Sequence, residues 1–178
     1  MKINLGCGEQ YADGWTNVDH AGSPYRVDAT VDLTGELPWS VGALEYVYAG
    51  HVLEHLFLSD ALDLLERLRE LMTPGGRIMC VGPDIARATA MEAAGTLETW
   101  VDEAGRSLGS TLDLLIYGGQ RWPGDEHRWA CDADTLVAML KETGWVDVAE
   151  VPISEVAPLW PVADRGPQWQ CAVGAVAP

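Results

Sequence analysis

The sequence predicts an α/β fold with a layered architecture and a largely parallel sheet. Two observations support this prediction. Short apolar runs of strand length are interleaved with segments of helical periodicity, and the early runs end in turns that contain glycine or aspartate. The chain has 178 residues, enough to bury a core without disulfides or metals, and we expect one domain over residues 1–178.

Four short apolar runs in the first third of the chain are predicted as strands. They cover residues 2–5, 15–18, 29–33 and 44–49. Only about ten residues separate the first two runs, fewer than a parallel crossover usually needs. We therefore expect at most a vestigial helix between them.

A helix is predicted over residues 59–73, where apolar residues recur at helical spacing and charged residues take the other face. Ser59 or Asp60 is expected to cap its start, and Pro74 with the two following glycines is expected to stop it. The apolar positions are Ala61, Leu64, Leu65, Leu68, Leu71 and Met72.

A fifth strand is predicted at residues 77–81. The segment from 84 to 130 then has helical composition interrupted by glycines, and we expect a helical insertion or lid there.

The last part of the chain is predicted as one helix and two strands. Asp132 or Asp134 caps the helix, and Gly144 provides its C-terminal stop. The strands cover residues 145–151 and 168–176.

Charge and composition restrict the partners. The formal net charge of −16, with no cluster of Lys or Arg, disfavours nucleic acid. No apolar run is long enough for a membrane span, and no export signal opens the sequence, so we expect a cytoplasmic protein.

The cysteines are widely spaced without a C-x-x-C pair, which predicts reduced and mostly buried thiols. They are Cys7, Cys80, Cys131 and Cys171.

The stretch HVLEH, residues 51–55, matches the H-x-x-E-H pattern of a zinc peptidase. On a helix, His51 and His55 would share one face and hold zinc beside Glu54 as a base. Gly50 just before the stretch, and the glycine turns upstream, favour the end of a strand instead. We therefore expect no metal and keep the peptidase as an alternative.

Three loops that follow strands carry residues suited to a nucleoside. Gly6-Cys7-Gly8 lets backbone N–H groups approach a ligand closely. Asp19 is placed to accept hydrogen bonds from the hydroxyls of a ribose. Asp32 could accept from an exocyclic amine, while the backbone N–H of Leu33 meets a ring nitrogen. Such sheets bind ligands at the carboxyl ends of their strands.

With these loops in order, the chain resembles the class I S-adenosylmethionine-dependent methyltransferases, in particular a group of small predicted ones. The matching stretches are NLGCG, GWTNVD, VDLTGELPW, YVYAGHVLEHL, LRELMTPGGRIMCVGPD and HRWACDADTLVAMLKETGW. The resemblance implies a Rossmann-like three-layer sandwich whose seven-stranded sheet is mostly parallel with an antiparallel last strand. It also implies S-adenosylmethionine as cofactor.

The resemblance assigns cofactor-binding roles to residues of these stretches. The glycine turn would pass under the methionine part, Asp19 would hold the ribose, and Asp32 with Leu33 would recognise adenine. Asn4 replaces an acid often found there, and Gln10 replaces a third glycine. The implied cofactor-binding set is Asn4, Gly6, Cys7, Gly8, Asp19, Asp32, Leu33 and His51.

Methyl transfer is an in-line attack on an activated carbon, so it depends largely on positioning, with a base where the acceptor is a hydroxyl. His51, His127 and Asp84 are the candidates for this catalytic role. Each has an alternative: His51 could only orient the cofactor, His127 could pair with an acidic neighbour, and Asp84 could cap a helix. Glu54 and His55 are assigned to packing and solvent.

The expected acceptor is a small molecule, a sugar or a peptide. A non-catalytic module that binds S-adenosylmethionine or acts as a scaffold is the other alternative, because Asn4 and the abbreviated glycine turn depart from the family pattern. The oligomeric state does not follow from the sequence.

Overall fold

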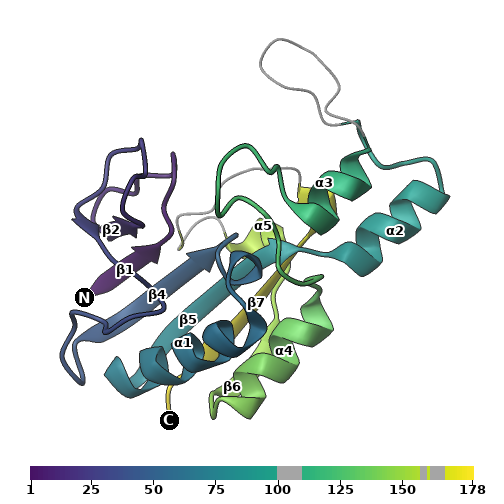
Figure 1. Ribbon diagram of the computed structural model, residues 1–178. Helices are drawn as coiled ribbons and strands as arrows, with labels where there is room; N and C mark the ends of the chain where they lie inside the picture. The colour runs from purple at the N-terminus through teal and green to yellow at the C-terminus, as the bar shows by residue number, and fades with distance from the viewer. Residues whose placement is uncertain (100–109, 157–159, 161–166) are drawn as a thin grey trace.

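The computed structural model describes residues 1–99, 110–156, 160 and 167–178, which form one sheet flanked by helices (Figure 1). The sheet has seven strands in the order β3-β2-β1-β4-β5-β7-β6. The strands are β1 (Lys2–Leu5), β2 (Thr16–Asp19), β3 (Ala29–Thr30), β4 (Leu44–Gly50), β5 (Met72–Pro83), β6 (Val146–Glu150) and β7 (Gln170–Val176). The helices are η1 (Leu53–His55), α1 (Leu58–Leu71), α2 (Ile85–Ala93), α3 (Thr111–Tyr117), α4 (Ala133–Glu142), α5 (Ile153–Val156) and η2 (Pro167–Trp169).

The strand directions confirm the predicted mixed sheet. Strands β1 to β5 pair in parallel, whereas β7 lies antiparallel between β5 and β6. The carboxyl ends of β1, β2, β4 and β5 therefore share one edge, and the loops that leave them meet there.

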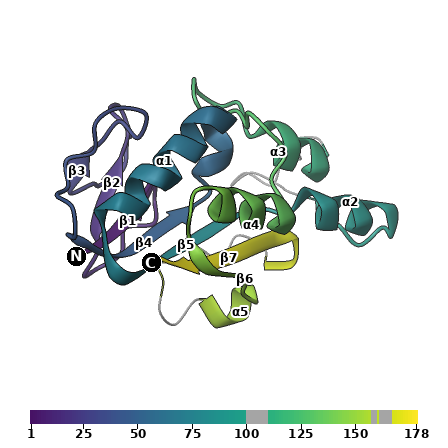
Figure 2. The same cartoon turned by 90° about the horizontal axis from the view of Figure 1, so that it is seen from below.

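Helices α1 and α4 cover one face of the sheet, and α5 lies on the other face (Figure 2). The covered face holds the larger core, in which Leu64, Leu65 and Leu68 of α1 are fully buried with Ile3 and Leu5 of β1. On the other face α5 and Trp160 pack against a smaller apolar cluster, so this third layer is thin in the part of the chain that the structure describes. Its buried members are Tyr48, Met79, Val81, Val156 and Ala172.

The connection from β1 to β2 contains no helix, as its length predicts. Two buried asparagines hold it instead. Asn4 donates to the carbonyl of Gln10 at 2.8 Å and to Oδ1 of Asn17 at 3.0 Å. The amide of Asn17 in turn donates to the carbonyl of Ala12 at 3.0 Å and to Asp28 at 3.1 Å. These bonds satisfy the loop backbone that a crossover helix would otherwise have satisfied.

Some predicted helix ends are confirmed and others are wrong. Asp132 caps α4 by accepting from the N–H of Thr135 at 2.7 Å, and Gly144 follows the helix with φ +83°. Helix α1 starts earlier than predicted, after Phe57, which makes no side-chain capping bond, so Ser59 and Asp60 lie inside the helix. Phe57 has an extended backbone, with φ −60° and ψ 148°, so the helix begins at Leu58.

The glycines after Pro74 do not act as a helix stop. Helix α1 ends at Leu71, and residues 74–76 belong to the start of β5, where the register with β4 shifts. Gly75 takes φ +77° there. Strand β3 is shorter than the predicted run 29–33, because its partner β2 ends at Asp19.

The predicted helical insertion contains α2 and α3, while residues 100–109 lie outside the described part of the chain. Both helices lie beyond the carboxyl end of β5 (Figure 1). A role as a lid stays a prediction. Among the residues described, no helix has the length and apolar character needed to cross a membrane.

Candidate functional site

The glycine turn after β1 contacts the end of β2. The backbone N–H of Gly8 donates to Oδ2 of Asp19 at 3.0 Å, and that of Cys7 donates to the carbonyl of Val18 at 3.0 Å. Gly6 and Gly8 take φ values of +56° and +50°, which glycine adopts without strain. The first two predicted loops therefore lie side by side at the carboxyl edge of the sheet.

The third predicted loop adjoins the same edge. The backbone N–H of Val31 donates to the carbonyl of Asp19 at 2.9 Å. Asp32 is exposed and accepts from the N–H and the hydroxyl of Thr34 at 2.9 and 2.8 Å. These hydrogen bonds lower the pKa of Asp32, so its carboxylate is ionised at neutral pH.

Arg67 of α1 holds this third loop through hydrogen bonds to its backbone. Its guanidinium donates to the carbonyl of Leu33 at 2.7 Å and also to that of Gly35. Arg67 is one of the charged residues on the polar face of its helix, and the sequence contains no signal for this role, since the partner carbonyls lie more than thirty residues away along the chain.

The loop after β4 packs on the glycine turn. A Cβ added at Gly6 would lie 2.5 Å from Cγ2 of Val52, the residue that follows His51. Close approach of the two loops therefore depends on the absence of a side chain at Gly6, and it brings His51 to the same edge.

His51 lies directly after β4 with φ +55°, a left-handed conformation that is uncommon outside glycine. Its Nδ1 lies 3.1 Å from Oε1 of Glu54, and its Nε2 lies 2.9 Å from Oε1 of Gln170. Both ring nitrogens are thus engaged by the protein. The zinc-peptidase alternative required His51 and His55 on one helical turn, and this geometry is not found, because only residues 53–55 are helical.

The environment of Glu54 differs from the prediction, which assigned this residue to packing and solvent. Its side chain is 1% exposed and bonds to His51. Burial acts to raise the pKa of Glu54, but the hydrogen bond from His51 and the nearby imidazoles of His55 and His127 outweigh it and hold this pKa at about 2. The signal in the sequence was the spacing of His51 and Glu54, three residues apart.

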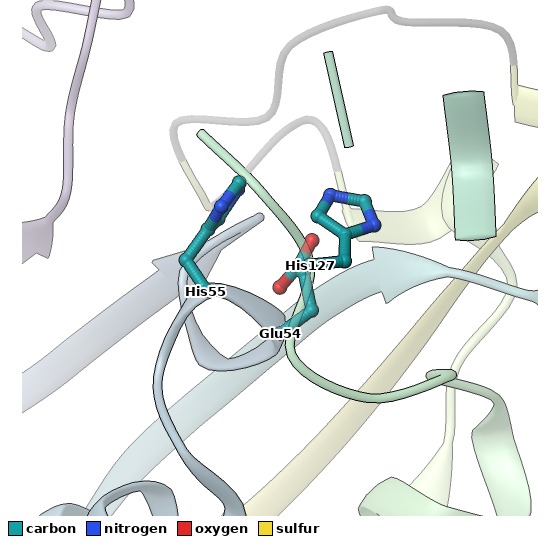
Figure 3. Close-up of side chains that lie close together, drawn as sticks. All are labelled: Glu54, His55 and His127. Atoms are coloured by element: carbon teal, nitrogen blue, oxygen red, sulfur yellow. The ribbon is translucent and has the colours of Figure 1, made fainter. Parts of the chain in front are cut away.

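His127 reaches the same place from the segment after α3 (Figure 3). Its Nδ1 lies 2.8 Å from the carbonyl of Leu115, so this nitrogen carries the proton. Its ring stands edge-on to that of His55, with centroids 4.8 Å apart. Burial lowers the pKa of His127, although Glu54 acts in the opposite direction, so the ring is neutral at neutral pH. The acidic neighbour of His127, Glu126, pairs with Arg128 instead.

Several solved structures are similar to this protein in fold. The structure is similar to a chain in the complex of the Haloferax volcanii Trm112 methyltransferase activator with a putative methyltransferase (TM-score 0.56, 16% identity, 99% of this chain and 81% of that chain). It is also similar to a putative S-adenosylmethionine-dependent methyltransferase of Listeria monocytogenes (TM-score 0.55, 13% identity, 99% of this chain and 89% of that chain). A third similar structure is phosphoethanolamine N-methyltransferase 2 of Haemonchus contortus in complex with S-adenosyl-L-methionine (TM-score 0.57, 12% identity, 100% of this chain and 50% of that chain).

The fold is that of S-adenosylmethionine-dependent methyltransferases. At these identities the likeness concerns the fold alone. No family model matches the sequence. A curated protein of Pelodictyon phaeoclathratiforme, described as S-adenosylmethionine:tRNA ribosyltransferase-isomerase, is 34% identical over 93 residues, or 52% of this chain. The match spans only a quarter of the length of that relative.

Within this methyltransferase fold, two predicted site residues have structural roles. Asp84 accepts from the N–H of Arg87 at 2.9 Å and caps α2, and its carboxylate also pairs with the guanidinium of Arg87 at 3.2 Å. Asn4 is 1% exposed, and its amide nitrogen holds the loop between β1 and β2. The helix-capping alternative for Asp84 is therefore the one that the structure shows.

Cys7 occupies the middle of the glycine turn, and its side chain is buried. Burial raises the pKa of its thiol to about 11, and Asp19 and Asp28 add to this effect. The thiol is protonated at neutral pH and contributes apolar packing.

Proposed function

We propose that this protein is an S-adenosylmethionine-dependent methyltransferase whose cofactor lies across the loops after β1, β2 and β3. The hydrogen bond from Gly8 to Asp19 is the observation that carries the proposal, because it joins two of these loops at the sheet edge where such folds bind ligands. The similarity to methyltransferase structures, one of them in complex with S-adenosyl-L-methionine, supports it.

The loops have room and an acceptor position for this cofactor. Apart from its two chain neighbours, no described residue has an atom within 4 Å of the position that a Cβ would take at Gly8, so a ligand could approach the backbone there. A carboxylate offers about four acceptor positions. Asp19 uses three, for the N–H groups of Gly8 and His20 and the hydroxyl of Ser23. A ribose hydroxyl could take the fourth position.

The cofactor would supply an activated methyl group, and the protein would supply position. We assign Gly6, Cys7 and Gly8 to the methionine part, Asp19 to the ribose, and Asp32 with Leu33 to adenine. We leave Asn4 out of this set because its amide is engaged within the protein.

Among the three predicted base candidates, we assign the acceptor side to His127. Asp84 caps a helix, and both ring nitrogens of His51 are engaged, so His51 acts as a positioning residue. His127 keeps Nε2 without a protein hydrogen bond within the described residues. The acceptor class remains a small molecule, a sugar or a peptide, since the net charge of −16 opposes nucleic acid. A cytoplasmic location also stays a prediction.

Replacing Asp19 by alanine is expected to weaken binding of S-adenosylhomocysteine by about 1 to 3 kcal/mol, the range for losing a charge-assisted hydrogen bond. The carboxylate would no longer accept from the ribose or hold the turn at Gly8. Isothermal titration calorimetry measures this affinity directly, without knowledge of the acceptor.

Asp13→Ala is the matched control, because it removes an exposed carboxylate from the connection between β1 and β2. It should leave the affinity unchanged. Equal affinity of Asp19→Ala and the wild type would refute the cofactor site. Tight binding of S-adenosylhomocysteine with no methyl transfer to any acceptor in a broad panel would favour the non-catalytic alternative.

A further inference from the structure

Glu54, His55 and His127 bring three potential metal ligands together from two distant parts of the chain. One carboxylate oxygen and one nitrogen from each ring lie within 4.8 Å of one another. Figure 3 shows the carboxylate of Glu54 between the two imidazoles. Of the three, only His127 has a role in the function proposed above.

Hydrogen bonds on both sides of His127 fix this arrangement. The backbone N–H of Arg128 donates to the carbonyl of Glu54 at 2.7 Å, and Nε1 of Trp129 donates to the carbonyl of Leu56 at 3.2 Å. The backbone N–H of His127 donates to the carbonyl of Tyr117 at 3.0 Å. The segment that carries His127 is thereby tied to η1 and to the end of α3.

Each of the three side chains also has an outer partner that orients it. His51 bonds one oxygen of Glu54, the carbonyl of Leu115 lies 2.8 Å from Nδ1 of His127, and the carbonyl of Glu126 lies 3.3 Å from Nδ1 of His55. Protein metal sites commonly hold their ligands in this way, with the second ring nitrogen donating to a carbonyl. In both histidines the arrangement leaves Nε2 for a metal.

The donor set and the local charge suit a zinc ion. Two imidazoles and one carboxylate form a common set for catalytic zinc, which keeps a fourth position for water or another molecule. The two nearby arginines are each paired with a carboxylate, Arg121 with Asp125 at 2.9 Å and Arg128 with Glu126, so their positive charges are balanced. The buried carboxylate of Glu54 thus offers a negative charge to a cation in a protein of net charge −16.

We propose that Glu54, His55 and His127 form a zinc-binding site with one open coordination position. Ligand atoms around tetrahedral zinc lie roughly 3.3 Å apart, so small side-chain rotations would close the present arrangement around the ion. This site differs from the zinc-peptidase alternative in its ligands, because His51 lies outside it and Glu54 binds the metal. Zinc bound at Nε2 of His127 would exclude His127 as the base proposed above, whereas the zinc site does not depend on the proposed cofactor site.

The test is a titration of the metal-free full-length protein with Zn²⁺ by calorimetry, and with Co²⁺ followed by visible absorption. We expect one site per chain with the absorption of tetrahedral cobalt bound to nitrogen and oxygen. His55→Ala and His127→Ala should each weaken zinc binding by at least about 100-fold, because a direct ligand matters more than the outer partners, whose loss typically costs 10 to 100-fold.

His20→Ala is the control, since this histidine is 58% exposed and lies elsewhere. It should bind zinc as the wild type does. Circular dichroism verifies that each variant is folded, and His55→Gln replaces any alanine variant that is not. Absence of stoichiometric zinc binding by the wild type, equal affinity of the folded His55 variant, or the strong near-ultraviolet bands of cobalt–thiolate bonds would overturn the proposal.

Titrating the same variants with S-adenosylhomocysteine separates this proposal from the proposed function. Asp19→Ala should lose cofactor affinity and keep zinc, whereas His55→Ala should lose zinc and keep cofactor affinity. The cofactor site and the zinc site can therefore fail independently of each other.

Discussion

Asn17→Ala is expected to lower the free energy of unfolding by roughly 3 to 4 kcal/mol, because buried partners would be left without hydrogen bonds. The side chain of Asn17 is fully buried and makes five hydrogen bonds in the β1–β2 region. Two of these join both the N–H and the carbonyl of Ala12. Urea denaturation followed by circular dichroism measures the change.

Two further variants test the cause of this loss. Asn17→Asp keeps the size and the acceptor but removes the amide donors and places a second carboxylate beside Asp28, 3.1 Å from the amide nitrogen. It should be destabilised to a similar degree. Thr30→Ala, on the exposed edge strand, should change stability by less than about 0.5 kcal/mol. A mild effect of Asn17→Ala would show that water replaces the network at little cost.

Gly6→Ala is expected to destabilise the protein by about 3 kcal/mol, from a left-handed backbone and an overpacked contact together. Gly6 has φ +56°, and the new methyl group would lie 2.5 Å from Cγ2 of Val52. The loop after β4 would have to move away from the glycine turn. Urea denaturation gives the stability, and calorimetry with S-adenosylhomocysteine shows whether the proposed cofactor site is lost with it.

Gly14→Ala is the matched control for this substitution. Gly14 has φ +81°, but no atom of the described residues beyond its chain neighbours lies within 4 Å of its added Cβ, so only the backbone penalty of about 1 kcal/mol applies. The double variant Gly6→Ala with Val52→Ala should recover the cofactor affinity by relieving the contact. Equal destabilisation by the two single glycine substitutions would contradict the role given to Val52.

The fold could be predicted because its signals are local. Apolar runs of strand length, the leucine spacing of α1 and the aspartate that caps α4 act within one or two turns of the chain. The same holds for the glycine turn and for Asp19, since each follows its own strand. The bounds were less accurate where a neighbour decides them, as in β3, which ends with its partner β2.

The contacts of the site could not be predicted in the same way. From the sequence, Glu54 is assigned to packing and solvent, yet its carboxylate is buried and hydrogen-bonded because His51 and the segment around His127 lie against it. Asn4 is expected among the cofactor ligands, and the sequence does not show that Asn17 on the neighbouring strand accepts a hydrogen bond from its amide. In both cases a residue far along the chain decides where the side chain bonds.

By itself the sequence determined an α/β protein with glycine and aspartate turns after its first strands, because periodicity and turn chemistry depend on neighbouring residues. Only the tertiary structure decided that Gly8 meets Asp19, that both nitrogens of His51 are engaged, and that His127 joins Glu54 and His55. Hydrogen bonding and burial of a polar side chain depend on which distant segments the packed sheet brings beside it, and no local pattern records that.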